Sequence, residues 1–299
     1  MPMSVLIAGL LAAAQASPPA EPAIVEISCP IGGASFDYVR PVPEAVTGLR
    51  PDGKPYSGAT YPPALPECPD NGLVLYKDYD EAEIAKLKPV IESADYQAQR
   101  GTDTAYYRAY RLMRVLGEAP DDYLWTLLQA SWEADDRPEL RTRYLTELVE
   151  AAAEVPARPE DLNWIGMEAR TVNALRELGR FNEARARLAS LPLASLDVAV
   201  PEAGKASEAE IRSARSRRNW SIYFKLLAGA IDRWDASMEP PDMIPRTVAL
   251  ARCADKDAAR GDTWRTFCDA QASAAPAAEQ ADPGKEMEVL RRPRKESGR

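Results

Sequence analysis

Residues 175–184 read LRELGRFNEA, and this stretch decides the fold class. One helical pattern ends at Gly179, because glycine suits the left-handed residue that commonly follows a helix. A second helical pattern begins at Phe181, so only a short turn separates the two. Ala184 is small, which lets two paired helices approach each other closely. The stretch therefore predicts two helices folded back on each other as a hairpin.

The same ten residues resemble the tetratricopeptide repeat. In that repeat a helix ending in Leu-Gly is followed by a short turn and by a helix that begins aromatic-x-Glu-Ala. We find no clean second copy at the repeat's period of about 34 residues. Two interpretations therefore stay open, an irregular solenoid of such repeats and an ordinary helical hairpin.

Helix signals continue on both sides of this hairpin. The sequences DEAE at 80–83 and SEAE at 207–210 are capping boxes, in which the first and last side chains bond the backbone N–H groups of a helix start. Proline, which suits the first position of a helix, opens three more segments. The expected helices start at Asp80, near Thr102, at Pro120, Pro138, Pro159, Phe181 and Ser207, and two short ones carry Cys253 and Cys268. The sequence thus predicts an antiparallel, tetratricopeptide-like array of helical hairpins over 79–270, with a disordered tail over 271–299.

The segment 23–78 has a different character, because prolines, glycines and other turn residues recur along it. Three short runs in it have the composition of strands. They are Ile24–Ile27, Ser35–Val39 and Leu73–Tyr76. The expected fold class is therefore mainly α, with a small N-terminal β module.

The N-terminus has the pattern of a secretory signal peptide. Residues 5–14 (VLIAGLLAAA) are apolar and lead into the small-x-small pattern Ala14-Gln15-Ala16. The run is shorter than the roughly 20 apolar residues that span a bilayer. A buried N-terminal helix is the alternative interpretation. We expect cleavage of residues 1–16, a flexible leader over 17–22, and a mature chain in the periplasm or secreted, with no stable membrane insertion.

Composition excludes several classes of function. The chain has 299 residues, with 37 Lys and Arg against 46 Asp and Glu, for a net charge of -9. A surface of this charge is repelled by nucleic acid. The chain has 0 histidines, which removes Ser-His-Asp and Cys-His catalysis and any His-ligated zinc. We therefore expect no nucleic-acid partner, no cofactor and no oxidoreductase site, because no Cys-x-x-Cys occurs.

Two of the four cysteines lie in matching contexts. Cys29 and Cys68 each begin a Cys-Pro-x-x-Gly sequence. These contexts are similar to the knuckles of zinc ribbons, which supply two thiolates each. Gly32 and Asn71 stand where the second cysteine of each knuckle belongs. Two thiolates without histidine do not close a zinc site, so we expect no bound metal.

The twin knuckles and the acidic helix start after them resemble an uncharacterised bacterial family, domain-of-unknown-function family 2225. The resemblance covers Ser28 to Leu191 and implies a zinc-ribbon-like module followed by tetratricopeptide-like helices. It implies no activity, because that family has none assigned. Four cysteines allow three pairings. We favour Cys29 with Cys68, on the resemblance of the two knuckles, and Cys253 with Cys268, on their proximity in the chain.

One helical segment alternates aromatic and basic residues and is the candidate binding face. Such a face can hold an anionic or sugar-like ligand by stacking and forked hydrogen bonds, although tyrosines beside a core stripe are the commoner case. The face consists of Tyr106, Tyr107, Arg108, Tyr110, Arg111 and Arg114. Two acidic clusters are more simply read as helix starts and solvated faces. They are Asp78, Asp80, Glu81 and Glu83, and Glu133, Asp135, Asp136 and Glu139.

These observations lead to two functional hypotheses of different classes. The first is an exported, non-enzymatic helical-repeat protein that acts as a scaffold or adaptor for an unknown protein partner. The alternative is a carboxylate-dependent hydrolase of cell-envelope glycans, or a binder of small anionic ligands. A carboxylate pair converging in one cavity favours the hydrolase. A groove lined by tyrosine and arginine favours the binder.

Overall fold

The computed structural model describes residues 22–255 and 261–278. The expected signal peptide, most of the leader and the last part of the expected tail therefore lie outside the described residues. Within the described part of the chain, no helix is long and apolar enough to cross a membrane.

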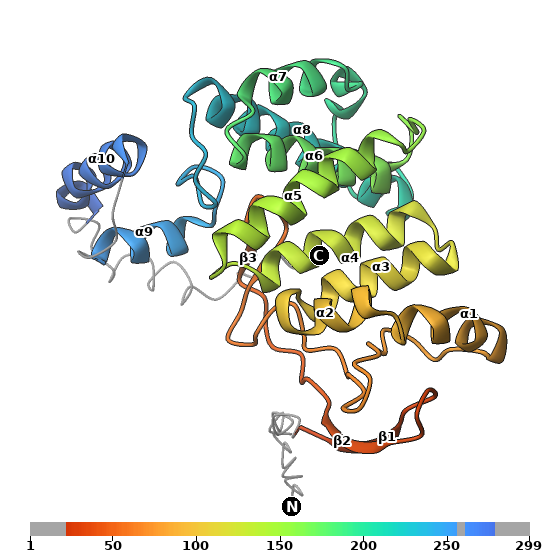
Figure 1. The fold of residues 1–299 in the computed structure, drawn as a ribbon. Coiled ribbons are helices and arrows are strands. Elements are labelled where there is room, and N and C mark those ends of the chain that lie inside the picture. The colour runs from red at the N-terminus through yellow and green to blue at the C-terminus, as the bar shows by residue number, and fades with distance from the viewer. Residues whose placement is uncertain (1–21, 256–260, 279–299) are drawn as a thin grey trace, which may run out of the picture.

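Helices dominate the described residues, as the sequence predicts (Figure 1). Ten α-helices and one short 3-10 helix, η1, follow two small strand pairs in these residues. The helices are α1 Glu81–Ile91, α2 Ala94–Thr102, α3 Ala105–Leu116, α4 Pro120–Glu133, α5 Pro138–Ala153, α6 Leu162–Glu177, α7 Phe181–Ala189, η1 Leu193–Leu196, α8 Glu208–Asp232, α9 Arg246–Ala254 and α10 Asp262–Ala278.

Most of the predicted helix starts are confirmed. Asp80 and Ser207 form complete capping boxes at α1 and α8, and Pro120 and Pro138 open α4 and α5. One start is wrong, because α6 begins after Asp161 and not at Pro159. One helix was missed: α2 begins after Ser93, whose hydroxyl accepts from the Tyr96 N–H.

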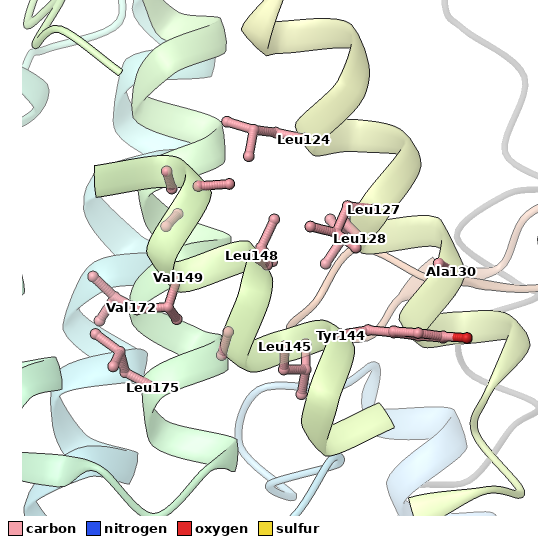
Figure 2. Packing of buried hydrophobic residues seen from close by; sticks show 14 of the residues in the cluster. Leu124, Leu127, Leu128, Ala130, Tyr144, Leu145, Leu148, Val149, Val172 and Leu175 are labelled. Atoms are coloured by element: carbon pink, nitrogen blue, oxygen red, sulfur yellow. The ribbon is translucent and has the colours of Figure 1, made fainter. Parts of the chain in front are cut away.

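Successive helices pack side by side from α3 to α6, joined by short turns (Figure 1). The hairpin predicted from residues 175–184 is present, because Gly179 adopts a left-handed φ of 71° between α6 and α7. The main hydrophobic core lies among these helices. Leu127, Leu148 and Val172, from α4, α5 and α6, are each 0% exposed (Figure 2). The packing confirms a mainly helical fold with helical hairpins, and the tetratricopeptide-like arrangement stays a prediction.

Two antiparallel strand pairs form the β part of the N-terminal module. Strand β1, Ile24–Ser28, pairs with β2, Ser35–Val39, and β3, Gly48–Leu49, pairs with β4, Pro55–Tyr56. The prediction of a third strand at Leu73–Tyr76 is wrong, since only an isolated bridge joins Glu67 and Val74. Two backbone hydrogen bonds flank this bridge, from the Leu75 N–H to the Pro66 carbonyl and from the Cys68 N–H to the Leu73 carbonyl, both at 2.9 Å. The Tyr79 hydroxyl adds a bond to the Val74 carbonyl.

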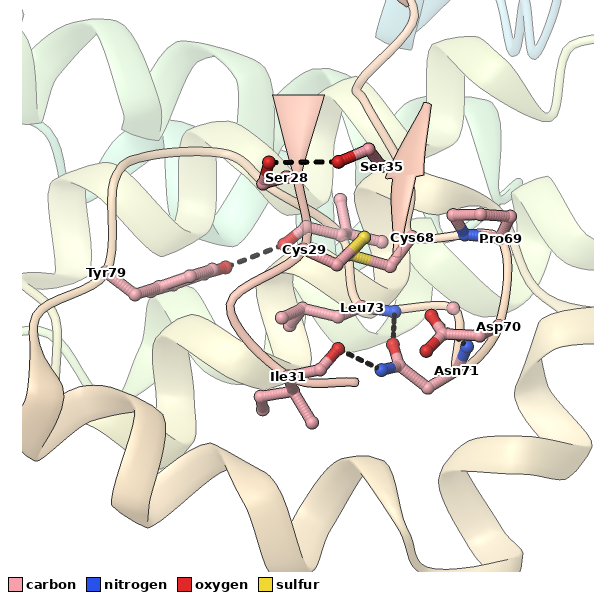
Figure 3. The surroundings of a disulfide bond; sticks show 12 residues. Ser28, Cys29, Ile31, Ser35, Cys68, Pro69, Asp70, Asn71, Leu73 and Tyr79 are labelled. Carbon is pink, nitrogen blue, oxygen red and sulfur yellow. Dashed lines mark hydrogen bonds between the residues drawn. A yellow bond between two sulfur atoms is a disulfide. The ribbon is translucent and has the colours of Figure 1, made fainter. Parts of the chain in front are cut away.

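Both favoured disulfides are present. The Cα atoms of Cys29 and Cys68 lie 5.7 Å apart, and Asn71 joins the two turns by donating to the Ile31 carbonyl at 2.7 Å (Figure 3). The Cα atoms of Cys253 and Cys268 lie 5.5 Å apart, linking α9 to α10. Helix α10 continues to Ala278, past the point where the disordered tail was expected to begin.

Candidate functional site

The predicted aromatic and basic face on α3 lies mostly inside the protein. Tyr106, Tyr107, Arg108 and Tyr110 are all buried, with exposed fractions of 7% or less. Tyr107 stacks on Tyr144 at a ring-centroid distance of 4.5 Å, which places it in the core between α3 and α5. The expectation of an open ligand face is therefore wrong for these four residues, because their rings supply core contacts.

The basic residues of that face are occupied by protein groups. Arg108 donates to both carboxylate oxygens of Glu67 and to the Gly72 carbonyl, which ties α3 to the N-terminal module. Arg111 and Arg114 are at the surface and lie 3.5 Å from Asp95 and Glu154. Arg108 is thereby a structural group. Arg111 and Arg114 instead stay at the surface, where they line a cavity of about 340 Å³ that is also lined by three glutamates, Glu147, Glu150 and Glu154.

The twin knuckles offer no thiolate ligands in this state. The ligand atoms of Cys29, Cys68 and Asp70 lie within 4.8 Å of one another. The two sulfur atoms are bonded to each other, however, and a disulfide sulfur lacks the negative charge with which a thiolate binds zinc. The close approach of the two knuckles is therefore explained by the cross-link.

A different arginine stands out in the structure. Arg170 on α6 has its guanidinium 5.4 Å from the ring centroid of Trp125 on α4 and 5.3 Å from that of Trp220 on α8. The absence of a side chain at Gly166, one turn earlier on α6, makes room for this stack. A Cβ atom there would lie 3.0 Å from the Trp220 ring. We call Trp125, Arg170 and Trp220 the tryptophan–arginine stack.

Arg170 differs from its neighbours in having no carboxylate partner. Within the described residues its one hydrogen bond runs from Nη1 to the Gly166 carbonyl at 2.7 Å, and its buried Nε has no acceptor. Arg50 and Arg141, by contrast, each contact two or more carboxylates. Burial lowers the pKa of Arg170, and the nearby Asp52 offsets this only in part. The pKa of Arg141 is raised despite burial, because Glu177 and Asp52 stabilise its charge.

Two cavities meet at the tryptophan–arginine stack. The larger, of about 370 Å³, lies among α4, α6 and α8. It is lined by Asp121, Asp122, Trp125, Leu162, Asn163, Gly166, Met167, Arg170 and Trp220. The smaller, of about 220 Å³, lies between the β3–β4 turn and α8. It is lined by Leu49, Arg50, Pro51, Gly53, Arg170, Asn219, Trp220, Tyr223 and Met243.

The β3–β4 turn is held in place by a buried network of charges. Asp52 on the turn accepts from Arg50 at 2.5 Å and from Arg141 on α5 at 3.1 Å. Lys54 donates to the Trp132 carbonyl on α4, and Tyr223 on α8 donates to the Pro51 carbonyl at 2.7 Å. The wall of the smaller cavity is therefore rigidly joined to three helices.

Members of both acidic clusters take part in the fold: Glu83 of the first cluster accepts from Lys77. Asp135 bonds Arg50, Lys54 and Arg141 in the buried network, and Glu133 accepts from the Tyr106 N–H. In the larger cavity, Asp121 is paired with Arg158. A glycosidase needs one carboxyl group with a raised pKa. In the first cluster, the hydrogen bond from Lys77 lowers the pKa of Glu83, which is the opposite direction.

No family model, curated protein or solved structure matches this chain significantly. The site therefore has to be read from its own geometry. Trp125 lies in the helix that the sequence predicts to start at Pro120. Arg170 and Trp220 carry no local signal, because an arginine on an amphipathic helix is usually solvated and the stack joins residues from three distant helices.

Proposed function

We propose that this chain is an exported, non-enzymatic binding protein that holds an anionic group of its ligand at Arg170. The observation that carries the proposal is the tryptophan–arginine stack, in which a guanidinium lines two cavities without a carboxylate partner among the described residues. Buried charges in proteins are normally paired, and removal of a charge from water is costly. A ligand anion supplies the missing charge.

The stack preorganises the Arg170 guanidinium for ligand binding. Indole faces attract a guanidinium by about 0.5–2 kcal/mol each, and they leave the edges of the guanidinium free for hydrogen bonds. Hydrogen bonds between ionised groups are roughly twice as strong as neutral ones. Trp125 and Trp220 therefore hold Arg170 in one orientation, so little side-chain entropy is lost when an anion binds.

Further features support the remaining parts of the proposal. Two disulfides are compatible with an oxidising compartment and hence with export. The chain has 0 histidines, and the carboxylates of the buried network are engaged with arginine and lysine, which favours binding over catalysis. An anionic group carried by a protein partner fits the adaptor hypothesis equally well. The resemblance to family 2225 and an irregular tetratricopeptide-like solenoid stay parts of this proposal.

A titration of the full chain with small anions tests the site. Acetate, benzoate and inorganic phosphate are added at constant ionic strength, and binding is followed by calorimetry. We expect saturable binding of at least one anion, lost in Arg170→Gln. The matched control is Arg185→Gln, because Arg185 also stacks on a tryptophan, Trp234, at 5.0 Å but is paired with Asp232. Binding that survives Arg170→Gln contradicts the proposal.

Export has its own test. Intact-mass measurement of the native product is expected to give a chain that starts at Ser17. A cytosolic product that retains Met1 contradicts this part of the proposal and leaves the anion site untouched.

A further inference from the structure

The two cavities beside Arg170 offer a ligand different surroundings. The larger one contains the carboxylates of Asp121 and Asp122. Asp121 is neutralised by Arg158, but Asp122 has no ion pair among the described residues. The charge of Asp122 repels an incoming anion, since unit charges 4 Å apart interact by about 4 kcal/mol near a protein surface. The smaller cavity has no carboxylate among its lining residues. An anion that reaches Arg170 is therefore accepted better from the side of the smaller cavity.

The charge balance of the smaller cavity limits the ligand to one negative charge. Its lining includes two arginines, Arg50 and Arg170. Arg50 is already neutralised, because it bonds Asp52 at 2.5 Å and Asp135 at 2.7 Å. Arg170 is the arginine of this lining that contacts no carboxylate among the described residues. A dianion such as phosphate leaves one charge unpaired in a partly dry site, which is costly.

The guanidinium presents only part of its edge to this cavity. Gly53, with φ of 92°, packs against the Nε side: a Cβ atom there would lie 2.9 Å from Nε and 3.0 Å from Nη2 of Arg170. The turn backbone thus lies beside both Nε and Nη2, and Nη1 already donates to Gly166. The outward N–H groups of the two terminal nitrogens remain for a ligand. Asn219, exposed on α8, lines the same cavity and adds an amide donor.

The rest of the cavity is apolar. Its walls are supplied by aliphatic, sulfur-containing and aromatic side chains, namely Leu49, Pro51, Trp220, Tyr223 and Met243. The Tyr223 hydroxyl is turned to the Pro51 carbonyl, so its ring and not its hydroxyl is available as a wall. A volume of about 220 Å³ is below the usual 300–1,000 Å³ of pockets for drug-sized ligands. It fits one aromatic ring or a short aliphatic chain.

We propose that the smaller cavity is a subsite for a monocarboxylate with a compact apolar body, such as an aromatic or short-chain acid or the end of a larger ligand. The carboxylate accepts from the terminal nitrogens of Arg170, and the apolar body packs between the β3–β4 turn and α8. This inference rests on the proposed anion site and adds the ligand class and the side from which the ligand enters.

Benzoate is the probe, and two exposed asparagines provide matched variants. Asn219 lines the smaller cavity and Asn163 lines the larger one. Both are exposed, and neither side chain makes a hydrogen bond within the described residues. Asn219→Trp fills the mouth of the smaller cavity, whereas Asn163→Trp fills the other. Calorimetry on the full chain compares benzoate, benzylamine and inorganic phosphate at constant ionic strength, and circular dichroism checks that each variant is folded.

We expect benzoate to bind more tightly than phosphate, and benzylamine not to bind. Asn219→Trp should weaken the affinity for benzoate at least about tenfold, whereas Asn163→Trp should change it less than about twofold. If Asn219→Trp does not fold, the isosteric pair Asn219→Asp and Asn163→Asp replaces it, and only Asn219→Asp is expected to weaken binding. If benzoate binding is lost in the Asn163 variant alone, or if the protein prefers phosphate, this inference is overturned and Arg170 remains an anion site. No Arg170-dependent binding of any anion overturns both.

Discussion

Arg141 on α5 donates to Asp52, a residue 89 positions earlier in the chain, at 3.1 Å, and also contacts Glu177 on α6 at 2.6 Å. Both carboxylates are almost completely buried, with side-chain exposures of 2% and 4%. One guanidinium therefore fixes the β3–β4 turn and two helices relative to one another. The wall of the smaller cavity depends on this contact, because Gly53 follows Asp52 directly.

Removal of Arg141 is expected to destabilise the protein strongly. Arg141→Met leaves two buried carboxylates without this partner, which typically costs about 3–5 kcal/mol of unfolding free energy. The matched control is Lys88→Met, because Lys88 pairs with Glu92 at the surface, where both side chains are more than half exposed. Exposed pairs contribute about 0–1 kcal/mol. Urea unfolding measures both variants, and equal losses contradict the role given to Arg141.

Asp52 predicts a pH dependence of stability. Burial alone raises the pKa of a carboxyl group, but Arg50 and Arg141 outweigh it and lower the pKa of Asp52 from 3.8 to about 2. A carboxyl group whose pKa is lower in the folded state than in the unfolded state stabilises the folded protein at any pH above the unfolded-state pKa. For Asp52 this stabilisation is about 2 kcal/mol, and it is lost as the pH falls from about 4 to about 2. Urea unfolding between pH 2 and 7 measures the free energy of unfolding of wild type and of Asp52→Asn. The difference between the two should shrink as the pH falls from about 4 to about 2. A constant difference contradicts the prediction.

Substitutions at two glycines distinguish the cost of backbone strain from the cost of a steric clash. Gly33 and Gly53 both have a positive φ, of 76° and 92°, but a Cβ atom meets nothing within 4 Å at Gly33 and meets Arg170 at Gly53. Gly33→Ala should therefore cost about 1–2 kcal/mol of stability from the left-handed backbone alone. Gly53→Ala should cost more and should also weaken benzoate binding, because Arg170 has to shift. Thermal unfolding and calorimetry test the pair, and equal effects refute the packing of Gly53 on Arg170.

The two disulfides should stabilise different parts of the chain. Cys29 and Cys68 are 39 positions apart and Cys253 and Cys268 are 15 apart. In the chain-entropy model, cross-links of these lengths contribute about 4 and about 3 kcal/mol. The double variant Cys29→Ser/Cys68→Ser should raise hydrogen exchange in residues 23–76 and leave α3–α6 protected. Cys253→Ser/Cys268→Ser is the control, with faster exchange confined to α9 and α10. Exchange that rises throughout in the first variant contradicts a separable module.

Local signals in the sequence predicted the helices well. Capping boxes, N-terminal prolines and Gly179 each act within one turn of chain, so the starts of α1, α4, α5 and α8 were readable. The helix α2 was missed because its only clear start signal is Ser93, and Gly101 interrupts its end. The favoured pairing of Cys29 with Cys68 was correct, because the two Cys-Pro-x-x-Gly segments form turns that lie side by side.

The candidate site was not readable in the same way. The basic and aromatic spacing on α3 was real, but the partners that bury it, Glu67 and Tyr144, lie about 40 positions away. Arg170 and Trp220 contact each other only because α6 and α8 pack together. A pattern of neighbouring residues does not contain such contacts, because they join residues that are distant in the chain.

The hydrogen bond from Tyr223 to the Pro51 carbonyl joins residues 172 positions apart. The smaller cavity therefore has no second wall until α8 docks on the β3–β4 turn, late in any order of folding that proceeds through nearby contacts first. A ligand held there reports on completion of the fold, since it binds the finished chain and not its earlier, partly assembled forms. Protection from proteolysis by the ligand would then measure how fast α8 docks on the β3–β4 turn.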